Sequence, residues 1–84
     1  MMEILIYTTL TCPYCINAKN LLEAKGALYK EIRIDENNNG LEQMLQKSNG
    51  AKSVPQIFIG NKHIGGFDDL NALNSQGKLD ELLG

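Results

Sequence analysis

The feature that most constrains the fold of this chain is a pair of cysteines, Cys12 and Cys15, spaced Cys-x-x-Cys between an apolar run and a helical pattern. Residues 3–7 are rich in large apolar and β-branched types, which predicts a short buried strand. A helix is predicted to begin near Thr11 or Cys12. Pro13 suits its first turn, because the N–H that proline lacks would have no partner there. The pair is therefore expected where a helix follows a strand, close enough to form a disulfide.

The rest of the chain alternates strands and helices in the same way. Strands are predicted over 28–34 and 56–59, and a tight hairpin turn at 60–61 leads into a strand over 63–65. The apolar residues that indicate two later helices and a short C-terminal turn are, in order, Leu41, Met44 and Leu45; Leu70 and Leu73; and Leu79, Leu82 and Leu83. The order β-α-β-α-β-β-α predicts an α/β fold with a four-stranded mixed sheet flanked by helices. A chain of 84 residues has room for one such domain, spanning 1–84.

Composition and charge exclude several classes of function. The net charge is −2 and Lys and Arg form no stripe, whereas nucleic-acid binding needs a basic surface. No apolar stretch approaches the length of a membrane span, and the N-terminal residues do not resemble a signal peptide. Two cysteines are also fewer than a small secreted domain held by disulfides usually carries. We therefore expect a cytoplasmic protein that binds neither nucleic acid nor membrane.

A Cys-x-x-Cys pair by itself is compatible with a metal site, a structural disulfide or redox chemistry. A closed zinc or iron–sulfur site takes four protein ligands, and His63 is the one further candidate ligand, so no metal site is expected. A disulfide across so short a loop would constrain the unfolded chain little. Redox chemistry is therefore the preferred interpretation. The helix N-terminus favours a thiolate at Cys12, the nucleophile at the exposed end, while Cys15 faces the core as the resolving thiol.

With these residues in place, the chain resembles the glutaredoxins, specifically the dithiol class with Cys-Pro-Tyr-Cys. Three motifs occur in the order and spacing of that family: Cys12-Pro13-Tyr14-Cys15; Ser53-Val54-Pro55, similar to the family's Thr-Val-Pro; and Gly65-Gly66-Phe67-Asp68-Asp69, similar to its Gly-Gly with an acidic pair. The resemblance covers essentially the whole chain, and together the motifs are highly specific. It implies a thioredoxin-like fold in which the Pro55 peptide is cis and faces the active site.

The resemblance also implies a substrate and a set of binding residues. The activity implied is that of a glutathione-dependent thiol-disulfide oxidoreductase, which reduces glutathione mixed disulfides and protein disulfides through Cys12 and Cys15. Glutathione is the reducing co-substrate, and no bound cofactor is implied. The residues implied to bind glutathione are Tyr14, Lys52, Ser53, Val54, Pro55, Gly66, Phe67, Asp68 and Asp69. The implied partners are glutathionylated or disulfide-containing proteins, with ribonucleotide reductase as one candidate, and a monomer is expected.

Two of these motifs also have a physical reading of their own. The residue before a proline is biased toward extended backbone, so Val54 can pair its N–H and C=O with a peptide-like ligand, or simply begin a strand. Gly65 and Gly66 place flexible backbone before a helix, where free N–H groups suit a carboxylate. A tight turn with Asp68 as the cap is the alternative there, and both readings can hold together.

One position departs from the family pattern. Glutaredoxins commonly carry Lys shortly before the cysteine motif, within Tyr-Thr-Lys, and this chain has Thr9 there. The change predicts weaker glutathione binding or a less stabilised thiolate at Cys12. Lys52 could compensate in part, or could be a solvated loop residue. The alternatives left open are a glutaredoxin-like protein reduced by thioredoxin reductase and, less favoured because of Pro13 and Cys15, a carrier of a [2Fe-2S] cluster.

Overall fold

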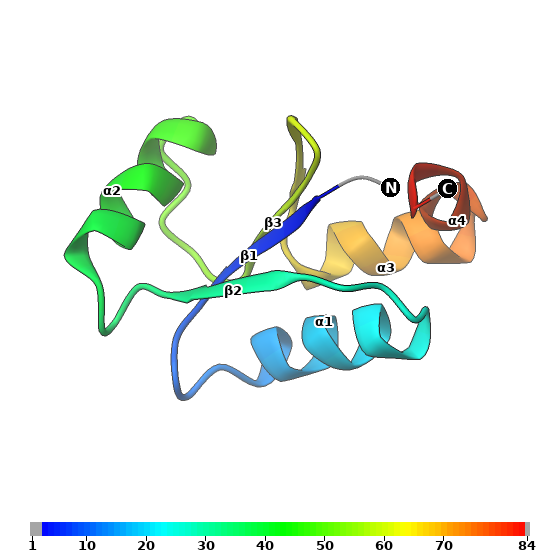
Figure 1. Cartoon of the computed structure of the whole chain (residues 1–84), viewed down its shortest axis with the longest axis horizontal. Helices are drawn as coiled ribbons and strands as arrows, with labels where there is room; N and C mark the ends of the chain where they lie inside the picture. The colour runs from blue at the N-terminus through cyan, green and yellow to red at the C-terminus, as the bar shows by residue number, and fades with distance from the viewer. Residues whose placement is uncertain (1–2, 84) are drawn as a thin grey trace.

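The computed structural model describes residues 3–83. Along them lie β1 (Ile4–Thr8), α1 (Pro13–Ala24), β2 (Lys30–Arg33), α2 (Asn38–Lys47), β3 (Gln56–Ile59), β4 (Lys62–Gly65), α3 (Phe67–Ser75) and α4 (Lys78–Leu83). The strands form one sheet in the order β2-β1-β3-β4, in which β1 and β2 are parallel and the other neighbours are antiparallel (Figure 1). The predicted mixed sheet flanked by helices is confirmed. No helix within the described range is both long and apolar enough to cross a membrane.

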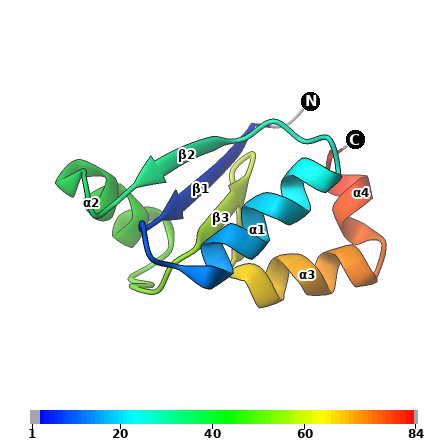
Figure 2. The ribbon, with the colours of Figure 1, turned by 90° about the horizontal axis from the view of Figure 1, so that it is seen from below.

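The two faces of the sheet are covered by different helices, because successive side chains of a strand point to opposite faces. The face that packs against α1, α3 and α4 carries Ile4, Ile6, Ile57 and Ile59. The opposite face, which packs against α2, carries Leu5, Tyr7 and Phe58. Figures 1 and 2 show α1 and α3 together on one side of the sheet and α2 on the other. Every residue of β1 and β3 is buried, so these central strands fix the positions of the loops that follow or precede them.

Besides shifts of one residue at β1 and β4, three boundaries differ from the expected ones. The strand expected over 28–34 is shorter, because its pairing with β1 begins only at Lys30 and Leu28 is 81% exposed. The expected C-terminal turn is the helix α4, which buries Leu79 in the core. Finally, α1 begins at Pro13, so Cys12 is its N-cap residue rather than part of its first turn. This last difference determines the geometry of the site.

Candidate active site

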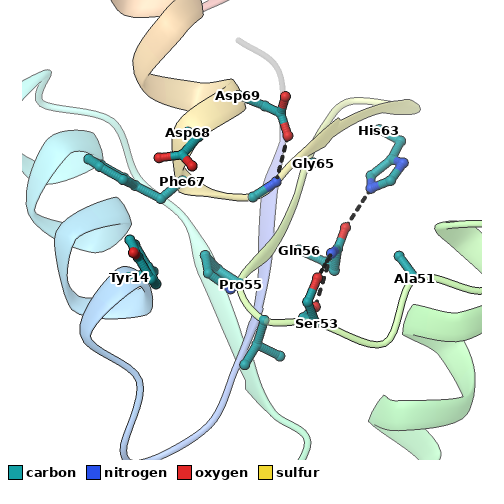
Figure 3. A pocket seen from close by; sticks show the side chains of 12 residues that line it. Tyr14, Ala51, Ser53, Pro55, Gln56, His63, Gly65, Phe67, Asp68 and Asp69 are labelled. Carbon is teal, nitrogen blue, oxygen red and sulfur yellow. Dashed lines mark hydrogen bonds between the residues drawn. The ribbon is translucent and has the colours of Figure 1, made fainter.

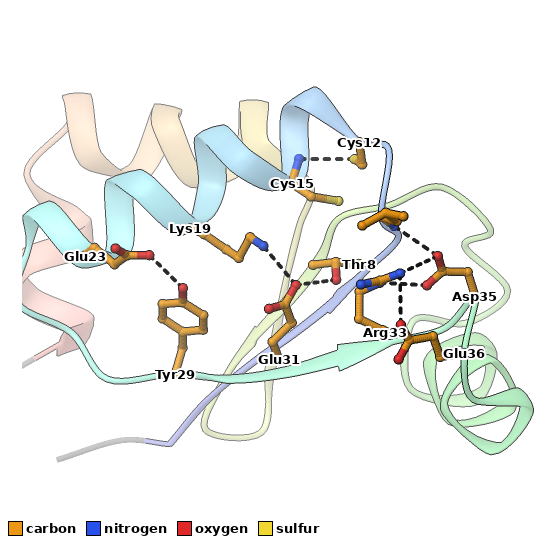
Figure 4. A network of polar contacts seen from close by, with 11 residues as sticks. Thr8, Cys12, Cys15, Lys19, Glu23, Tyr29, Glu31, Arg33, Asp35 and Glu36 are labelled. Atoms are coloured by element: carbon orange, nitrogen blue, oxygen red, sulfur yellow. Dashed lines mark hydrogen bonds and ion pairs between the residues drawn. The ribbon is translucent and has the colours of Figure 1, made fainter.

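The N-terminus of α1 is organised around the sulfur of Cys12. Cys12 has extended backbone (φ −132°, ψ 100°), and its Sγ accepts a hydrogen bond from the Cys15 N–H at 3.1 Å (Figure 4). Pro13 occupies the first helical position, where its missing N–H leaves no donor unsatisfied. The remaining N–H groups and the positive end of the helix dipole favour negative charge on this sulfur. The geometry is that expected of a nucleophilic cysteine.

Cys12 is nevertheless less exposed than its place in the sequence indicated. Only 7% of the residue is accessible, and its thiol donates to the carbonyl oxygen of Val54 at 3.7 Å. The expectation of a sulfur at an exposed helix end is therefore wrong. Val54 belongs to the loop before β3 and covers Cys12 from a distant part of the sequence.

Cys15 lies one turn further into α1 and is 1% exposed. Burial, together with the side-chain hydrogen bond with Cys12, raises the pKa of the Cys15 thiol from 9.0 to about 12. The Thr9 backbone and Lys19 oppose this shift without cancelling it. Both cysteines are free, and one sulfur is held by a helix N–H while the other is a buried, protonated thiol. Within residues 3–83, no three His, Cys, Asp or Glu side chains are grouped so that they could hold a metal ion.

A groove of about 370 Å³ extends from the start of α1, across the loop before β3, to the start of α3 (Figure 3). It is lined by Tyr14, Ala51, Ser53, Val54, Pro55, Gln56, His63, Gly65, Gly66, Phe67, Asp68 and Asp69. All the residues predicted for a ligand site therefore meet here, with the exception of Lys52. Lys52 is exposed and lies next in sequence to lining residues, but it is not itself part of the lining.

Close backbone approach shapes the wall of the groove at Pro55. The Val54–Pro55 peptide bond is cis, as the resemblance implied. Gly66 lies beside it, and a Cβ at Gly66 would make an ordinary van der Waals contact with the Pro55 carbonyl oxygen, at 3.5 Å. Gly65 has φ +113°, a conformation that favours glycine, and a Cβ there would overlap the Asp69 carboxylate. Gly65 is thus the position in the turn into α3 that requires glycine, because of its backbone conformation and the Asp69 carboxylate beside it.

The start of α3 combines N–H donors with carboxylates. The Asp69 carboxylate accepts a hydrogen bond from the Gly66 N–H at 3.2 Å, which is one of the two hydrogen bonds of a capping box, since glycine has no side chain to form the other. Asp68 and Asp69 are both exposed and add two negative charges to this end of the groove. The N–H groups of Phe67 and Asp68 belong to the first turn of α3, where N–H groups have no acceptor within the helix. This wall can therefore bind a ligand in which a carboxylate and an ammonium group lie close together, the first through the N–H groups and the second through the carboxylates.

Sequence reasoning missed the polar pair Gln56 and His63 on the groove wall. Gln56 Nε2 donates to the Ser53 carbonyl oxygen at 2.9 Å, and its Oε1 accepts from His63 Nε2 at 2.6 Å. The His63 ring also stacks on Phe58 with a centroid distance of 4.8 Å, so His63 is not simply a solvated edge residue. The hairpin could have indicated this pair. Phe58 lies opposite His63, and residues that pair across two antiparallel strands point to the same face of the sheet. Gln56, two residues before Phe58, points to that face as well. Ala51 and Gly65 also line the groove, and the binding prediction did not include them either.

The loop between β1 and α1 is held from the side of β2 (Figure 4). Arg33 donates two hydrogen bonds to Asp35 at 2.8 Å, and Asp35 Oδ2 accepts from the Leu10 N–H at 3.1 Å. The Arg33 guanidinium holds the pKa of Asp35 at about 2, below its usual 3.8. This link fixes the backbone two residues before Cys12.

A second link joins α1 to the strands beneath it. Glu31 Oε2 accepts a hydrogen bond from the buried Thr8 hydroxyl at 2.6 Å and forms an ion pair with Lys19 Nζ at 3.0 Å. The Thr8 hydrogen bond is the main cause that lowers the pKa of Glu31. Lys19 is therefore neither fully solvated nor directed at a ligand; it ties α1 to β2.

Comparison with known proteins agrees with this arrangement. The family model described as Glutaredoxin matches residues 4–64. The chain is 52% identical over 83 residues to glutaredoxin 3 of Escherichia coli K12, covering 99% of both chains. It is 51% identical to the glutaredoxin of Pseudomonas aeruginosa, covering 99% of this chain and 98% of that one. Among solved structures, the buckwheat glutaredoxin–glutathione complex has a TM-score of 0.87 at 33% identity, covering 98% of this chain and 76% of the other.

The fold and the two unequal cysteines define a thiol-disulfide oxidoreductase with a thioredoxin-like fold. The chain belongs to the glutaredoxin family, whose members are glutathione-dependent oxidoreductases. The family, fold class and enzyme class expected from the sequence are confirmed.

Proposed function

We propose that the groove binds glutathione and that the sulfur of Cys12 exchanges disulfides with it. The observation that carries this proposal is the 3.7 Å contact between Cys12 Sγ and the Val54 carbonyl, because Val54 lines the groove. A reactive sulfur at the edge of a groove can react with a ligand held in it. The related buckwheat glutaredoxin was solved as a complex with glutathione, which supports the choice of ligand.

The groove offers counterparts for the γ-glutamyl and cysteinyl residues of the tripeptide. The γ-glutamyl carboxylate of glutathione accepts hydrogen bonds from the Phe67 and Asp68 N–H groups at the positive end of α3. Its ammonium group lies beside the carboxylates of Asp68 and Asp69. Val54 pairs its backbone with the cysteinyl residue, as an added strand would, and the Tyr14 ring flanks the tripeptide.

Three of the other predicted residues shape the site, and the fourth, Lys52, contributes charge. Ser53, Pro55 and Gly66 form the wall against which the tripeptide backbone lies. Lys52, outside the lining, attracts the glycine carboxylate from a distance, in partial replacement of the lysine that Thr9 does not supply. Glutathione binding that is weaker than is typical of the family follows from this arrangement.

With a glutathionylated substrate, one cysteine is sufficient. The Cys12 thiolate attacks the glutathione sulfur, the substrate thiolate leaves and takes up a proton, and a Cys12–glutathione mixed disulfide remains. A second glutathione, as thiolate, attacks the glutathione sulfur of that mixed disulfide and restores Cys12. Overall one free glutathione is consumed: the substrate mixed disulfide and one glutathione thiol give the substrate thiol and glutathione disulfide.

With a protein disulfide, both cysteines take part. Cys12 attacks one substrate sulfur and forms a mixed disulfide, and the substrate's second thiolate is released. Cys15 then loses its proton and displaces the remaining substrate sulfur, which leaves the Cys12–Cys15 disulfide for glutathione to reduce. The high pKa of Cys15 keeps it protonated until this step, so it does not compete with Cys12 for substrates.

This chemistry indicates the compartment, the substrates and the oligomeric state of the protein. We place the protein in the cytoplasm, where a glutathione pool poised below about −200 mV can drive the cycle. The substrates are glutathionylated and disulfide-containing proteins, with ribonucleotide reductase as a candidate. The protein acts as a monomer, because Cys12, Cys15 and the groove all belong to one chain.

The experiment that tests this proposal uses the Cys15→Ser variant and a small glutathione mixed disulfide, with glutathione reductase and NADPH as the coupled readout. The expected result is robust turnover, because Cys12 alone completes the one-cysteine cycle. The matched Cys12→Ser variant should be inactive. A folded Cys15→Ser variant with free Cys12 and no turnover would contradict the proposal and favour a protein reduced by thioredoxin reductase.

A further inference from the structure

Two large apolar side chains beside Cys12 are left exposed by the fold. Leu10 is 69% exposed and Ile16 is 51% exposed, and neither is among the residues that line the groove. Leu10 lies two residues before Cys12, and the Ile16 N–H donates to the Cys12 carbonyl oxygen at 3.1 Å, one helical turn away. The backbone of both residues therefore lies within one helical turn of the Cys12 backbone. We refer to these two side chains as the Leu10–Ile16 patch.

The patch lies on the flank of Cys12 that faces away from the groove. Successive residues of a helix are about 100° apart, so Tyr14 and Ile16 project to opposite sides of the inward-facing Cys15. Tyr14 lines the groove, which places Ile16 on the other flank. Ile16 precedes Lys19 by three residues, and Lys19 reaches across to β2.

Leu10 lies on this same flank, because its N–H donates a hydrogen bond to Asp35, two residues after the end of β2. Asp35 is itself held by two hydrogen bonds from Arg33. The backbone that presents Leu10 is therefore fixed before any partner arrives, which reduces the ordering cost of binding. An exposed leucine on a fixed loop offers apolar surface that another apolar side chain can remove from water.

The charged groups of this flank are engaged with one another. Lys19 pairs with Glu31, and Arg33 pairs with Asp35. A charged side chain on a partner would have to compete with these pairs, whereas an apolar side chain would remove exposed surface of Leu10 and Ile16 from water. The flank therefore suits an apolar contact.

We propose that the Leu10–Ile16 patch selects protein disulfides whose attacked cysteine is flanked by a bulky apolar residue. The inference rests on the proposed function, since it concerns the substrates of Cys12. The geometry limits the occupant: in a mixed disulfide the two Cα atoms are about 4.4–6.8 Å apart, and the next Cα of the partner is about 3.8 Å further on. A residue beside the partner's cysteine is thus brought to the patch by the bond itself.

Glutathione does not need this flank, because the groove on the opposite side of Cys12 accommodates a tripeptide. The patch therefore separates two classes of substrate. Small glutathione mixed disulfides should be insensitive to Leu10 and Ile16, whereas extended polypeptides should respond to both. The reaction itself is unchanged: Cys12 attacks, Cys15 displaces the second sulfur, and two peptide thiols leave while the Cys12–Cys15 disulfide forms.

The test compares two homodimeric peptide disulfides, one with Leu on both sides of its cysteine and one with Ser in those places. Each is mixed in single turnover with the fully reduced wild-type protein, and the released peptide thiol is quantified after acid quenching. The wild type should reduce the Leu peptide about tenfold faster than the Ser peptide. The double variant Leu10→Ser, Ile16→Ser should lose most of this preference.

Two controls make the outcome decisive. Leu28→Ser removes an apolar side chain that is 81% exposed and belongs to the segment between α1 and β2, so it should keep the full preference. Turnover of a small glutathione mixed disulfide should be equal in all three proteins, which shows that the variants are folded and reactive. No preference in the wild type, or the same preference in the double variant, would overturn the inference. The single-turnover reaction contains no glutathione, so failure of glutathione turnover alone would count against the proposed function instead.

Discussion

Cys15 should be far less reactive in the folded chain than in the unfolded chain. The pKa of its thiol is raised from 9.0 to about 12, chiefly by burial. At pH 8, a thiol with the ordinary pKa is ionised in roughly one molecule in ten, and a thiol with the raised pKa in roughly one in ten thousand. Because only the thiolate is alkylated, the rate constant should fall by about three orders of magnitude on folding.

The Cys12→Ser variant isolates this thiol, and serine keeps an acceptor at the N-cap of α1. Iodoacetamide is added to the native variant and to the same variant in guanidinium chloride, and alkylated Cys15 is followed by mass spectrometry. Since the variant lacks the contribution of Cys12 to the shift, we expect a ratio of at least about a hundredfold. The native rate should also rise about tenfold per pH unit between pH 8 and 10 without a plateau near 9.

A native rate within a factor of ten of the unfolded rate would refute the reasoning. A plateau near pH 9 would refute it as well, because it would indicate an ordinary thiol that is merely shielded. In either case Cys15 could compete with Cys12 for substrates, and the assignment of the two sulfurs to separate steps would lose its physical basis.

Three further predictions concern stability and the shape of the groove. Leu22→Ala in α1 should lower the free energy of unfolding by about 2–5 kcal/mol in urea, because the side chain is fully buried. Gly65→Ala should cost about 1–3 kcal/mol and raise the KM for glutathione substrates, because it forces a positive φ and displaces Asp69. Asp35 has a folded-state pKa of about 2 against 3.8, so its stabilisation is complete above pH 3.8 and is lost as pH falls through 2. In the Asp35→Asn variant, the free energy of unfolding should therefore depend less steeply on pH below 3.8. An unchanged pH dependence would exclude a role for the pair of Asp35 with Arg33.

The fold was largely predictable because its central strands are buried on both faces. The strand β3, with the sequence Gln-Ile-Phe-Ile, reads as one apolar run after a proline, and its bounds were predicted correctly. The edge strand β2 is different, since Lys30 and Glu31 are exposed and no pattern marks its beginning. Its start is set by pairing with β1, which is a tertiary property.

The features of the site that could be predicted are likewise those that depend on local sequence. Motifs that are local in sequence, such as the cysteine pair and the Gly-Gly turn, could be assigned to elements from spacing alone. The cover of Cys12 by Val54 and the bond between Gln56 and His63 depend on segments brought together by the sheet. No spacing rule reports the contact between Cys12 and Val54, so the burial of Cys12 emerged only in the folded chain. The hairpin register could have indicated the contact between Gln56 and His63, but this register was not used.

The hydrogen bond from the Cys15 N–H to Cys12 Sγ has a thermodynamic consequence. In the proposed cycle, the acceptor that caps α1 is the atom that each turnover converts from thiolate to disulfide, and a neutral disulfide sulfur is a poorer acceptor than a thiolate. This hydrogen bond therefore stabilises the reduced fold more than the oxidised fold. A tighter cap makes the chain a weaker electron donor and makes its disulfide easier to reduce. The end of one helix thus links the folding equilibrium of the protein to its redox equilibrium.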